Sequence, residues 1–207
     1  MAFSLFLAAG TVRYWQGWAY LAVFFGCSFA ITLDLFRHDR TLLERRLRGG
    51  PFAETRVAQR IIMLFTSLGF VALLVVPALD YRLGWSRVPA QVEVCGLVLI
   101  AASFYAISLV YRENTFTAAT IQVEPGQTVV STGPYAVVRH PMYAGSVPMF
   151  LGTPLALGSY WGLLVFVVIT PFLIWRLLDE ERFLARNLPG YADYQRRVRW
   201  RLIPGVF

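Results

Sequence analysis

The residues best suited to chemistry in this sequence lie in two short stretches on either side of a long apolar run. The first stretch, residues 132–145, is polar and rich in turn-forming residues, and it contains the triplet Arg139-His140-Pro141. The second stretch contains Arg176 and Glu180, where the apolar run ends. A cation, an acid and a histidine brought together would suit a small zwitterionic molecule, because each of its charges would find a partner.

The histidine of the first stretch, His140, is one of only two in the chain. Pro141 disfavours a helical conformation at His140 and suits the first turn of a helix that follows. His140 would then lie beside free backbone N–H groups at a helix start, where anions are favoured. Tyr135 and Tyr143 lie within a few positions. The alternative interpretation is a histidine that only caps the helix or is satisfied in the core.

The second stretch combines opposite charges with an apolar helix. Arg176 and Glu180 are four residues apart, so they share one helix face. A charge one turn inside an apolar span is costly and by default indicates function. The alternative for Arg176 is a side chain that extends to the membrane surface. We expect Asp179 and Glu181 only to mark the water boundary.

Other kinds of site find little support in the sequence. We expect no metal centre, because no second histidine or cysteine accompanies His140. No glycine-rich phosphate loop, nucleotide fingerprint or Ser-His-Asp set is apparent.

The composition indicates an integral membrane protein. The chain has 207 residues, of which 57% are hydrophobic and 15% charged, and the mean hydropathy is +0.55. Soluble domains carry about 25% charged residues. The net charge of +7 comes from 19 arginines with no lysine, and these flank apolar runs. Anionic lipid headgroups and membrane orientation explain them better than nucleic acid does.

The pattern of apolar runs predicts an all-α membrane fold of about five transmembrane helices. Three single spans are expected at residues 15–33, 61–79 and 92–110. Residues 144–175 are uncharged and too long for one span, so we expect a C-terminal helical hairpin that turns at residues 158–162. Residues 1–10 are expected to form a short surface helix. Residues 34–60 should form an amphipathic helix that breaks at Gly49-Gly50-Pro51.

The distribution of arginines predicts the orientation of these spans. With the N-terminus outside, 15 arginines face the cytoplasm and three face the other side, in agreement with the positive-inside rule. The same topology places residues 132–145 and 176–181 at the two ends of one hairpin and therefore side by side. We expect a cytoplasmic pocket at the membrane boundary, suited to a zwitterionic cofactor and a lipid-like substrate that enters from the bilayer.

The combined pattern resembles the superfamily of isoprenylcysteine carboxyl methyltransferases and phospholipid methyltransferases, which are integral membrane enzymes. It reads Gly133-Pro134-Tyr135-x-x-x-Arg139-His140-Pro141-x-Tyr143-x-Gly145, then Glu180-Glu181, then Tyr191-x-x-Tyr194-x-x-x-Val198. The likeness covers roughly residues 110–205. We therefore expect a single membrane domain, 1–207, with N-terminal spans in residues 1–112 and a methyltransferase-like catalytic core in residues 113–207.

The resemblance implies S-adenosyl-L-methionine as the methyl donor. The residues that it implies for donor binding are Gln127, Thr128, Val129, Val130, Tyr135, His140, Pro141, Met142, Tyr143 and Glu180. It also implies that Arg176 binds the substrate and acts with Glu180 in catalysis. Met142 stands where eukaryotic carboxyl methyltransferases commonly have serine, and Gln122 is a further candidate for contact with the donor.

The expected activity is methyl transfer to a lipid-like or isoprenoid acceptor in the membrane, with a carboxylate favoured. A carboxylate needs little acid–base help, because the sulfonium carries its own leaving group. Arg176 could bind it with two hydrogen bonds, and Glu180 could balance the charge of the donor. An amine would have to lose a proton, and Arg176 would repel its charged form. Lipid amines, isoprenoid acids and small thiols all stay open as acceptors.

Two other functions are compatible with parts of the pattern. Membrane sterol reductases carry a similar Arg-His-Pro triplet, so an NADPH-dependent reductase is one alternative. A non-catalytic membrane protein is the other. The arginine-only composition favours the inner membrane of a bacterium as the location.

Overall fold

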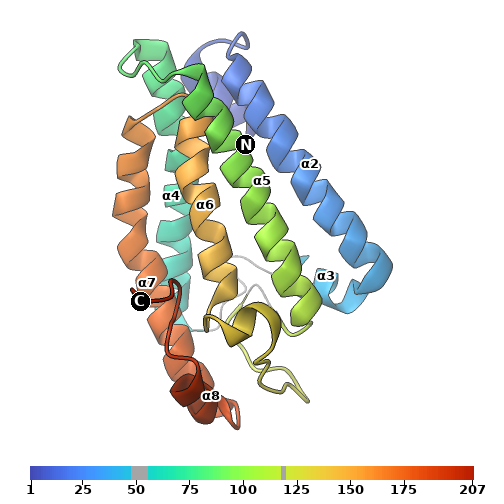
Figure 1. The fold of residues 1–207 in the computed structure, drawn as a ribbon. Helices are drawn as coiled ribbons and strands as arrows, with labels where there is room; N and C mark the ends of the chain where they lie inside the picture. Colours follow the sequence, from blue (N-terminus) through green and yellow to red (C-terminus); the bar gives the residue numbers. More distant parts are fainter. Residues whose placement is uncertain (48–55, 118–119) are drawn as a thin grey trace.

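The protein is a bundle of helices whose loops gather mostly at one end (Figure 1). The computed structural model describes residues 1–47, 56–117 and 120–207, and in these ranges it consists of helices and loops. The expected break at Gly49-Gly50-Pro51 lies outside the described residues. The helices in chain order are α1 (Ala2–Ala9), α2 (Trp15–His38), α3 (Arg40–Leu47), α4 (Val57–Leu83), α5 (Ala90–Glu113), the 3₁₀ helix η1 (Gly133–Ala136), α6 (Pro141–Ala156), α7 (Trp161–Asn187) and α8 (Tyr191–Arg197).

Four of the described helices, α2, α4, α5 and α7, are long and apolar enough to cross a membrane. This confirms the all-α integral membrane fold. The fifth expected span is α6, which has 16 residues. At 1.5 Å per residue it rises about 24 Å, less than the hydrocarbon thickness of roughly 30 Å. The helix is short because it begins only at Pro141, after the polar stretch, and ends at Ala156, two residues before Gly158, whose φ is +71°.

The predicted helical hairpin is formed by α6 and α7, but α7 is longer than expected. It continues to Asn187 and so carries residues 176–181 within the helix. Similarly, α4 begins at Val57, so residues 57–60 belong to a span rather than to the amphipathic segment. The amphipathic segment itself contains α3, which buries Leu42. The N-terminal segment is helical, and its position at the membrane surface stays a prediction.

Two close helix pairs form the frame of the bundle: α5 packs against α6, and α4 packs against α7. Glycines make the first pair possible. A Cβ atom at Gly96 of α5 would lie 2.4 Å from the backbone nitrogen of Ala156, and one at Gly152 would lie 2.6 Å from the carbonyl oxygen of Gly96. Such backbone contact is typical of helices that associate in lipid through small residues. The frame fixes the start of α6 beside the ends of α5 and α7 (Figure 1).

At the end of the bundle away from the start of α6, a buried acid joins α4 to the turn between α6 and α7. Asp80, near the end of α4, is 1% exposed and accepts hydrogen bonds from the Ser86 and Ser159 hydroxyls at 2.6 and 2.5 Å. Ser159 lies in the turn between α6 and α7, so this cluster ties the hairpin to α4. The satisfied carboxylate accounts for an acid buried in an apolar bundle.

Candidate active site

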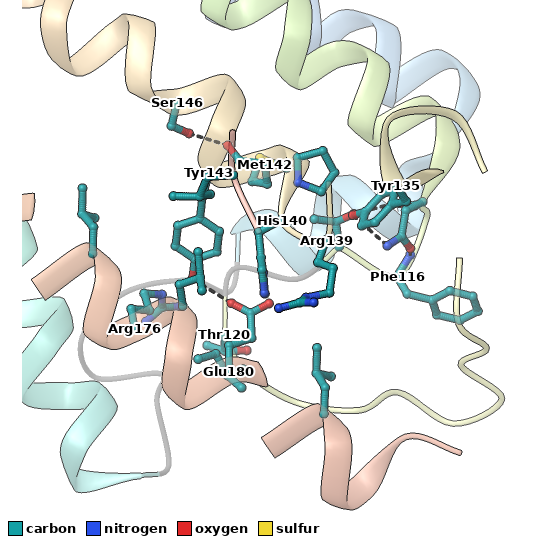
Figure 2. Close-up of a pocket in the computed structure, with 18 of the residues that line it drawn as sticks. Phe116, Thr120, Tyr135, Arg139, His140, Met142, Tyr143, Ser146, Arg176 and Glu180 are labelled. Carbon is teal, nitrogen blue, oxygen red and sulfur yellow. Dashed lines mark hydrogen bonds between the residues drawn. The ribbon is translucent and has the colours of Figure 1, made fainter. Parts of the chain in front are cut away.

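A cavity of about 470 Å³ lies where the ends of α6 and α7 meet the loop after α5. Residues of α4, η1 and α8 complete its walls (Figure 2). Every residue predicted to bind the donor or the acceptor lines this cavity: Gln122, Gln127, Thr128, Val129, Val130, Tyr135, His140, Pro141, Met142, Tyr143, Arg176 and Glu180. The structure thus confirms that residues 132–145 and 176–181 lie side by side. The individual roles of these residues stay predictions.

The acid that organises the polar end of the cavity is Glu181. Its Oε1 accepts a hydrogen bond from Arg139 Nε at 2.6 Å and lies 3.2 Å from His140 Nε2, and its Oε2 accepts from Arg201 Nε at 2.9 Å. Glu181 is only 4% exposed. The expectation that it only marks the water boundary is therefore wrong. It is buried because the segment after α8 folds back over the end of α7.

That segment runs along the Arg-His-Pro triplet. The backbone N–H groups of Arg139 and His140 donate to the carbonyls of Trp200 and Arg201 at 2.9 and 3.0 Å. The Arg139 guanidinium also donates to the Val198 carbonyl at 2.9 Å. Backbone and side-chain bonds together fix the orientation of His140. His140 therefore has a partner within the protein and also lines the cavity, so its role in ligand binding stays a prediction.

The second acid, Glu180, faces the cavity and pairs with a tyrosine. The Tyr143 hydroxyl donates to Glu180 Oε2 at 2.7 Å (Figure 2). The Tyr143 ring meets the His140 ring edge-on, with centroids 5.7 Å apart. An acid, a phenol and an imidazole are therefore held together at the start of α6. These side chains come from the two stretches that the sequence singles out.

Tyr135 forms another part of the wall and is held by two partners. Asn114 Nδ2 donates to its hydroxyl at 3.0 Å, and the Tyr194 hydroxyl donates to its carbonyl at 2.7 Å. Burial raises the pKa of Tyr135, so its hydroxyl stays protonated at neutral pH. Asn114 was not among the predicted site residues. Its signal in the sequence is an amide directly after the charged residues Arg112 and Glu113 that end α5.

The loop that leads to this wall is shaped by its own glutamines. Gln127 Oε1 accepts from the backbone N–H of Glu124 at 2.9 Å, and Gln122 Nε2 donates to the Glu124 carboxylate at 2.6 Å. The turn contains Gly126 with φ +75°, a conformation that glycine adopts without strain. Local hydrogen bonds therefore shape this loop, and Gln122 and Gln127 line the cavity.

Arg176 points into the protein rather than towards the membrane surface. It is 9% exposed, and its Nη1 donates to Gln59 Oε1 of α4 at 2.9 Å. Asp179 is also buried, at 8% exposed, and it accepts from Arg56 Nη2 at 2.8 Å. The expectation that Asp179 only marks the water boundary is also wrong, because α7 continues past it and Asp179 pairs with Arg56 and with Gln59 of α4. No pattern in the sequence pointed to Gln59.

The other part of the cavity is apolar and belongs to the spans. Its walls there come from α4, α6 and α7, with Met63, Val147, Phe150, Phe166, Leu173 and Ile174. The cavity therefore joins a polar region at the helix ends to an apolar region at membrane depth. An amphiphilic molecule would match both regions. In the described ranges, no three His, Cys, Asp or Glu side chains are grouped to hold a metal ion.

A helical membrane bundle with this motif and this amphipathic cavity is similar to the integral membrane methyltransferases, as the sequence resemblance indicates. Residues 92–189 match the phospholipid methyltransferase family. The matched region begins in α5 and ends just after α7, so it contains most of the cavity wall. Helix α4 lies outside it.

Curated relatives are similar to the chain over part of its length. The chain is 36% identical to phosphatidylethanolamine N-methyltransferase of Rattus norvegicus over 90 residues, which are 44% of this chain and 43% of that protein. It is 36% identical to protein-S-isoprenylcysteine O-methyltransferase of Schizosaccharomyces pombe over 72 residues, 34% of this chain and 30% of that protein. It is 30% identical to the cobalt-zinc-cadmium resistance protein CzcN of Cupriavidus metallidurans over 106 residues, which are 49% of this chain and 47% of that protein. The chain thus spans less than half of each of these relatives.

Proposed function

We propose that the protein transfers a methyl group from S-adenosyl-L-methionine to a lipid-like acceptor, and that the acceptor group is a carboxylate. The observation that carries the proposal is the amphipathic cavity, which combines Arg176 and Glu180 at its polar end with apolar walls at membrane depth. The acceptor class is isoprenoid or acyl, as in an isoprenylcysteine, because a long apolar chain fits those walls.

The residues at the polar end fit the chemistry of this donor, which carries both signs of charge. Glu180 offers a carboxylate to its positive charge, and Tyr143 holds that carboxylate in place at 2.7 Å. The helix start at Pro141 offers backbone N–H groups, which favour a negative group. When bound, the donor supplies a methyl group already activated on a sulfonium. Gln127 to Val130, Tyr135, His140 and Met142 would form the rest of its walls.

Arg176 would bind and orient the acceptor carboxylate through two charge-assisted hydrogen bonds. A carboxylate is already ionised at neutral pH, so no residue has to remove a proton from it. The main task of the protein is then to position the reacting groups and to exclude water. Arg176 and Glu180 are four residues apart on α7, so the acceptor and donor sites would adjoin.

A lipid amine is the second candidate acceptor. The observation that favours it is the match to the phospholipid methyltransferase family, together with a relative named for phosphatidylethanolamine. An amine acceptor would need a base to take its proton, and Glu180 is the acid that lines the cavity nearest Tyr143. The charge of Arg176 makes this candidate the weaker of the two.

Methyl transfer in detergent distinguishes these acceptors. Purified protein is incubated with radiolabelled S-adenosyl-L-methionine and, separately, N-acetyl-S-farnesylcysteine, the methyl ester of that compound, and phosphatidylethanolamine. We expect label in the free acid and not in the ester, which differs only by the blocked carboxylate. Label in phosphatidylethanolamine alone would overturn the carboxylate assignment. Thermal stabilisation by NADPH but not by S-adenosylhomocysteine would instead support a reductase.

We further propose that the chain is one membrane domain whose catalytic core, residues 113–207, faces the cytoplasm from a bacterial inner membrane. The excess of arginines at the cavity end of the bundle supports this orientation.

A further inference from the structure

A buried amide links α4 to the arginine of the candidate acceptor site. Gln59 has no exposed surface. Its Oε1 accepts from Arg176 Nη1 at 2.9 Å, and its Nε2 donates to Asp179 Oδ2. The other oxygen of Asp179 accepts from Arg56 Nη2 at 2.8 Å. Arg176 lines the cavity, whereas Gln59 stands behind it and is not part of the wall.

The chemistry of these groups suits an amide between them. A guanidinium can only donate hydrogen bonds, and an ionised carboxylate can only accept them. Gln59 supplies one acceptor to Arg176 and one donor to Asp179, which neither an acid nor a base can do alone. Since all three side chains are buried, each lost bond would leave a polar group unsatisfied. The orientation of the Arg176 side chain is therefore coupled to Gln59.

Helix α4 also contributes to the cavity directly. Met63 and Thr66 line it. Met63 lies four residues after Gln59, and Thr66 lies three residues after Met63, so all three are on one helix face. This face meets α7, with which α4 forms one of the two close pairs. The family match begins only at residue 92, so this face is supplied by a part of the chain outside the matched region.

We propose that Gln59 is the positioning residue for Arg176, and that acceptor recognition therefore depends on α4 as well as on the methyltransferase core. The proposal rests on the proposed function, in which Arg176 binds the acceptor carboxylate. Gln59 touches neither donor nor acceptor. Its effect is to restrict the orientation of the Arg176 guanidinium at the cavity wall.

The test is the split between KM and kcat for N-acetyl-S-farnesylcysteine. Gln59→Met keeps the side-chain length and removes both hydrogen bonds. We expect at least a tenfold rise in KM, with kcat and the dissociation constant of S-adenosylhomocysteine within twofold of the wild type. Unchanged donor binding shows that the variant is folded. Gln91→Met is the matched control, since Gln91 is exposed at the start of α5, and it should behave as the wild type.

A double variant separates positioning from packing. Gln59→Glu alone places two carboxylates together and should raise KM as well. Adding Asp179→Asn exchanges amide and acid, so the pattern of donors and acceptors from Arg176 to Arg56 is restored. We expect the double variant to recover a KM within threefold of the wild type. A wild-type KM in Gln59→Met, or no recovery in the double variant, would overturn the proposal. A wild type that methylates no free acid would overturn the carboxylate assignment itself and the proposal with it.

Discussion

Two adjacent acids at the end of α7 serve different partners. Glu180 faces the cavity and holds Tyr143, whereas Glu181 is buried under the final segment and joins Arg139, His140 and Arg201. The difference follows from helix geometry, because neighbouring residues point about 100° apart. One acid is available to a ligand, and the other fixes the residues that surround it.

Removing the charge of Glu181 should destabilise the protein. Glu181→Gln leaves the buried Arg139 and the partly exposed Arg201 without their carboxylate, and breaking the buried pair with Arg139 costs about 3 kcal/mol or more. We expect a clearly lower melting temperature in detergent. Asp193→Asn is the control: that carboxylate pairs with Arg196 at an exposed site, where such pairs contribute at most about 1 kcal/mol. Equal melting temperatures for the two variants would contradict the structural role of Glu181.

Tyr143 should contribute to donor affinity through Glu180. Tyr143→Phe removes one hydrogen bond to a charged group, worth about 1.5 kcal/mol or more, so we expect binding of S-adenosylhomocysteine to weaken by about tenfold. Isothermal titration measures this. Tyr105→Phe changes a tyrosine that is 67% exposed on α5 and should leave the affinity unchanged. The same affinity in both variants would remove Tyr143 from the donor site.

At the scale of elements, the backbone contact between α5 and α6 sets the position of the cavity. The start of α6 carries His140 and Tyr143, so a shift of α6 moves both. Close contact at Gly96 and Gly152 leaves no room for a side chain. The hairpin and the meeting of the two motif stretches could be predicted from the sequence, because both follow from span lengths and loop order.

A methyl group at the α5–α6 contact tests this arrangement. Gly96→Ala would place Cβ 2.4 Å from a backbone nitrogen, so the helices must separate, at a cost of about 1–3 kcal/mol. Gly26→Ala is the control, since its Cβ would meet nothing within 4 Å. We expect a lower melting temperature and weaker donor binding only in Gly96→Ala. An unchanged melting temperature would mean that the contact is looser than described.

At the scale of the whole molecule, contacts between distant parts of the chain complete the site. Gln59 and Arg176 are 117 residues apart, and Arg139 and Val198 are 59 apart. Neither pair follows from local pattern, since each depends on how α4 meets α7 or how the final segment folds back. For this reason the burial of Asp179 and Glu181 could not be predicted from the sequence. The cavity residues could be predicted from local sequence patterns. Their buried partners, such as Gln59 and Glu181, could not.

The orientation of the molecule in the membrane is open to direct test. In a variant with Cys27→Ser and Cys95→Ser, a single cysteine is placed by Trp85→Cys or by Arg197→Cys at exposed positions on opposite ends of the bundle. A membrane-impermeant maleimide added to intact cells should label the first variant, and the second only after permeabilisation. The reverse pattern would put the cavity on the outer side.

All the roles proposed for the cavity residues depend on binding of S-adenosyl-L-methionine, and titration of the purified protein with S-adenosylhomocysteine measures binding at this site. We expect saturable binding of one equivalent in the wild type. Binding should be lost in His140→Ala and Glu180→Ala, whose side chains line the cavity. No binding in the folded wild type would show that the cavity does not hold this donor. Wild-type affinity in both variants would show that the donor binds elsewhere.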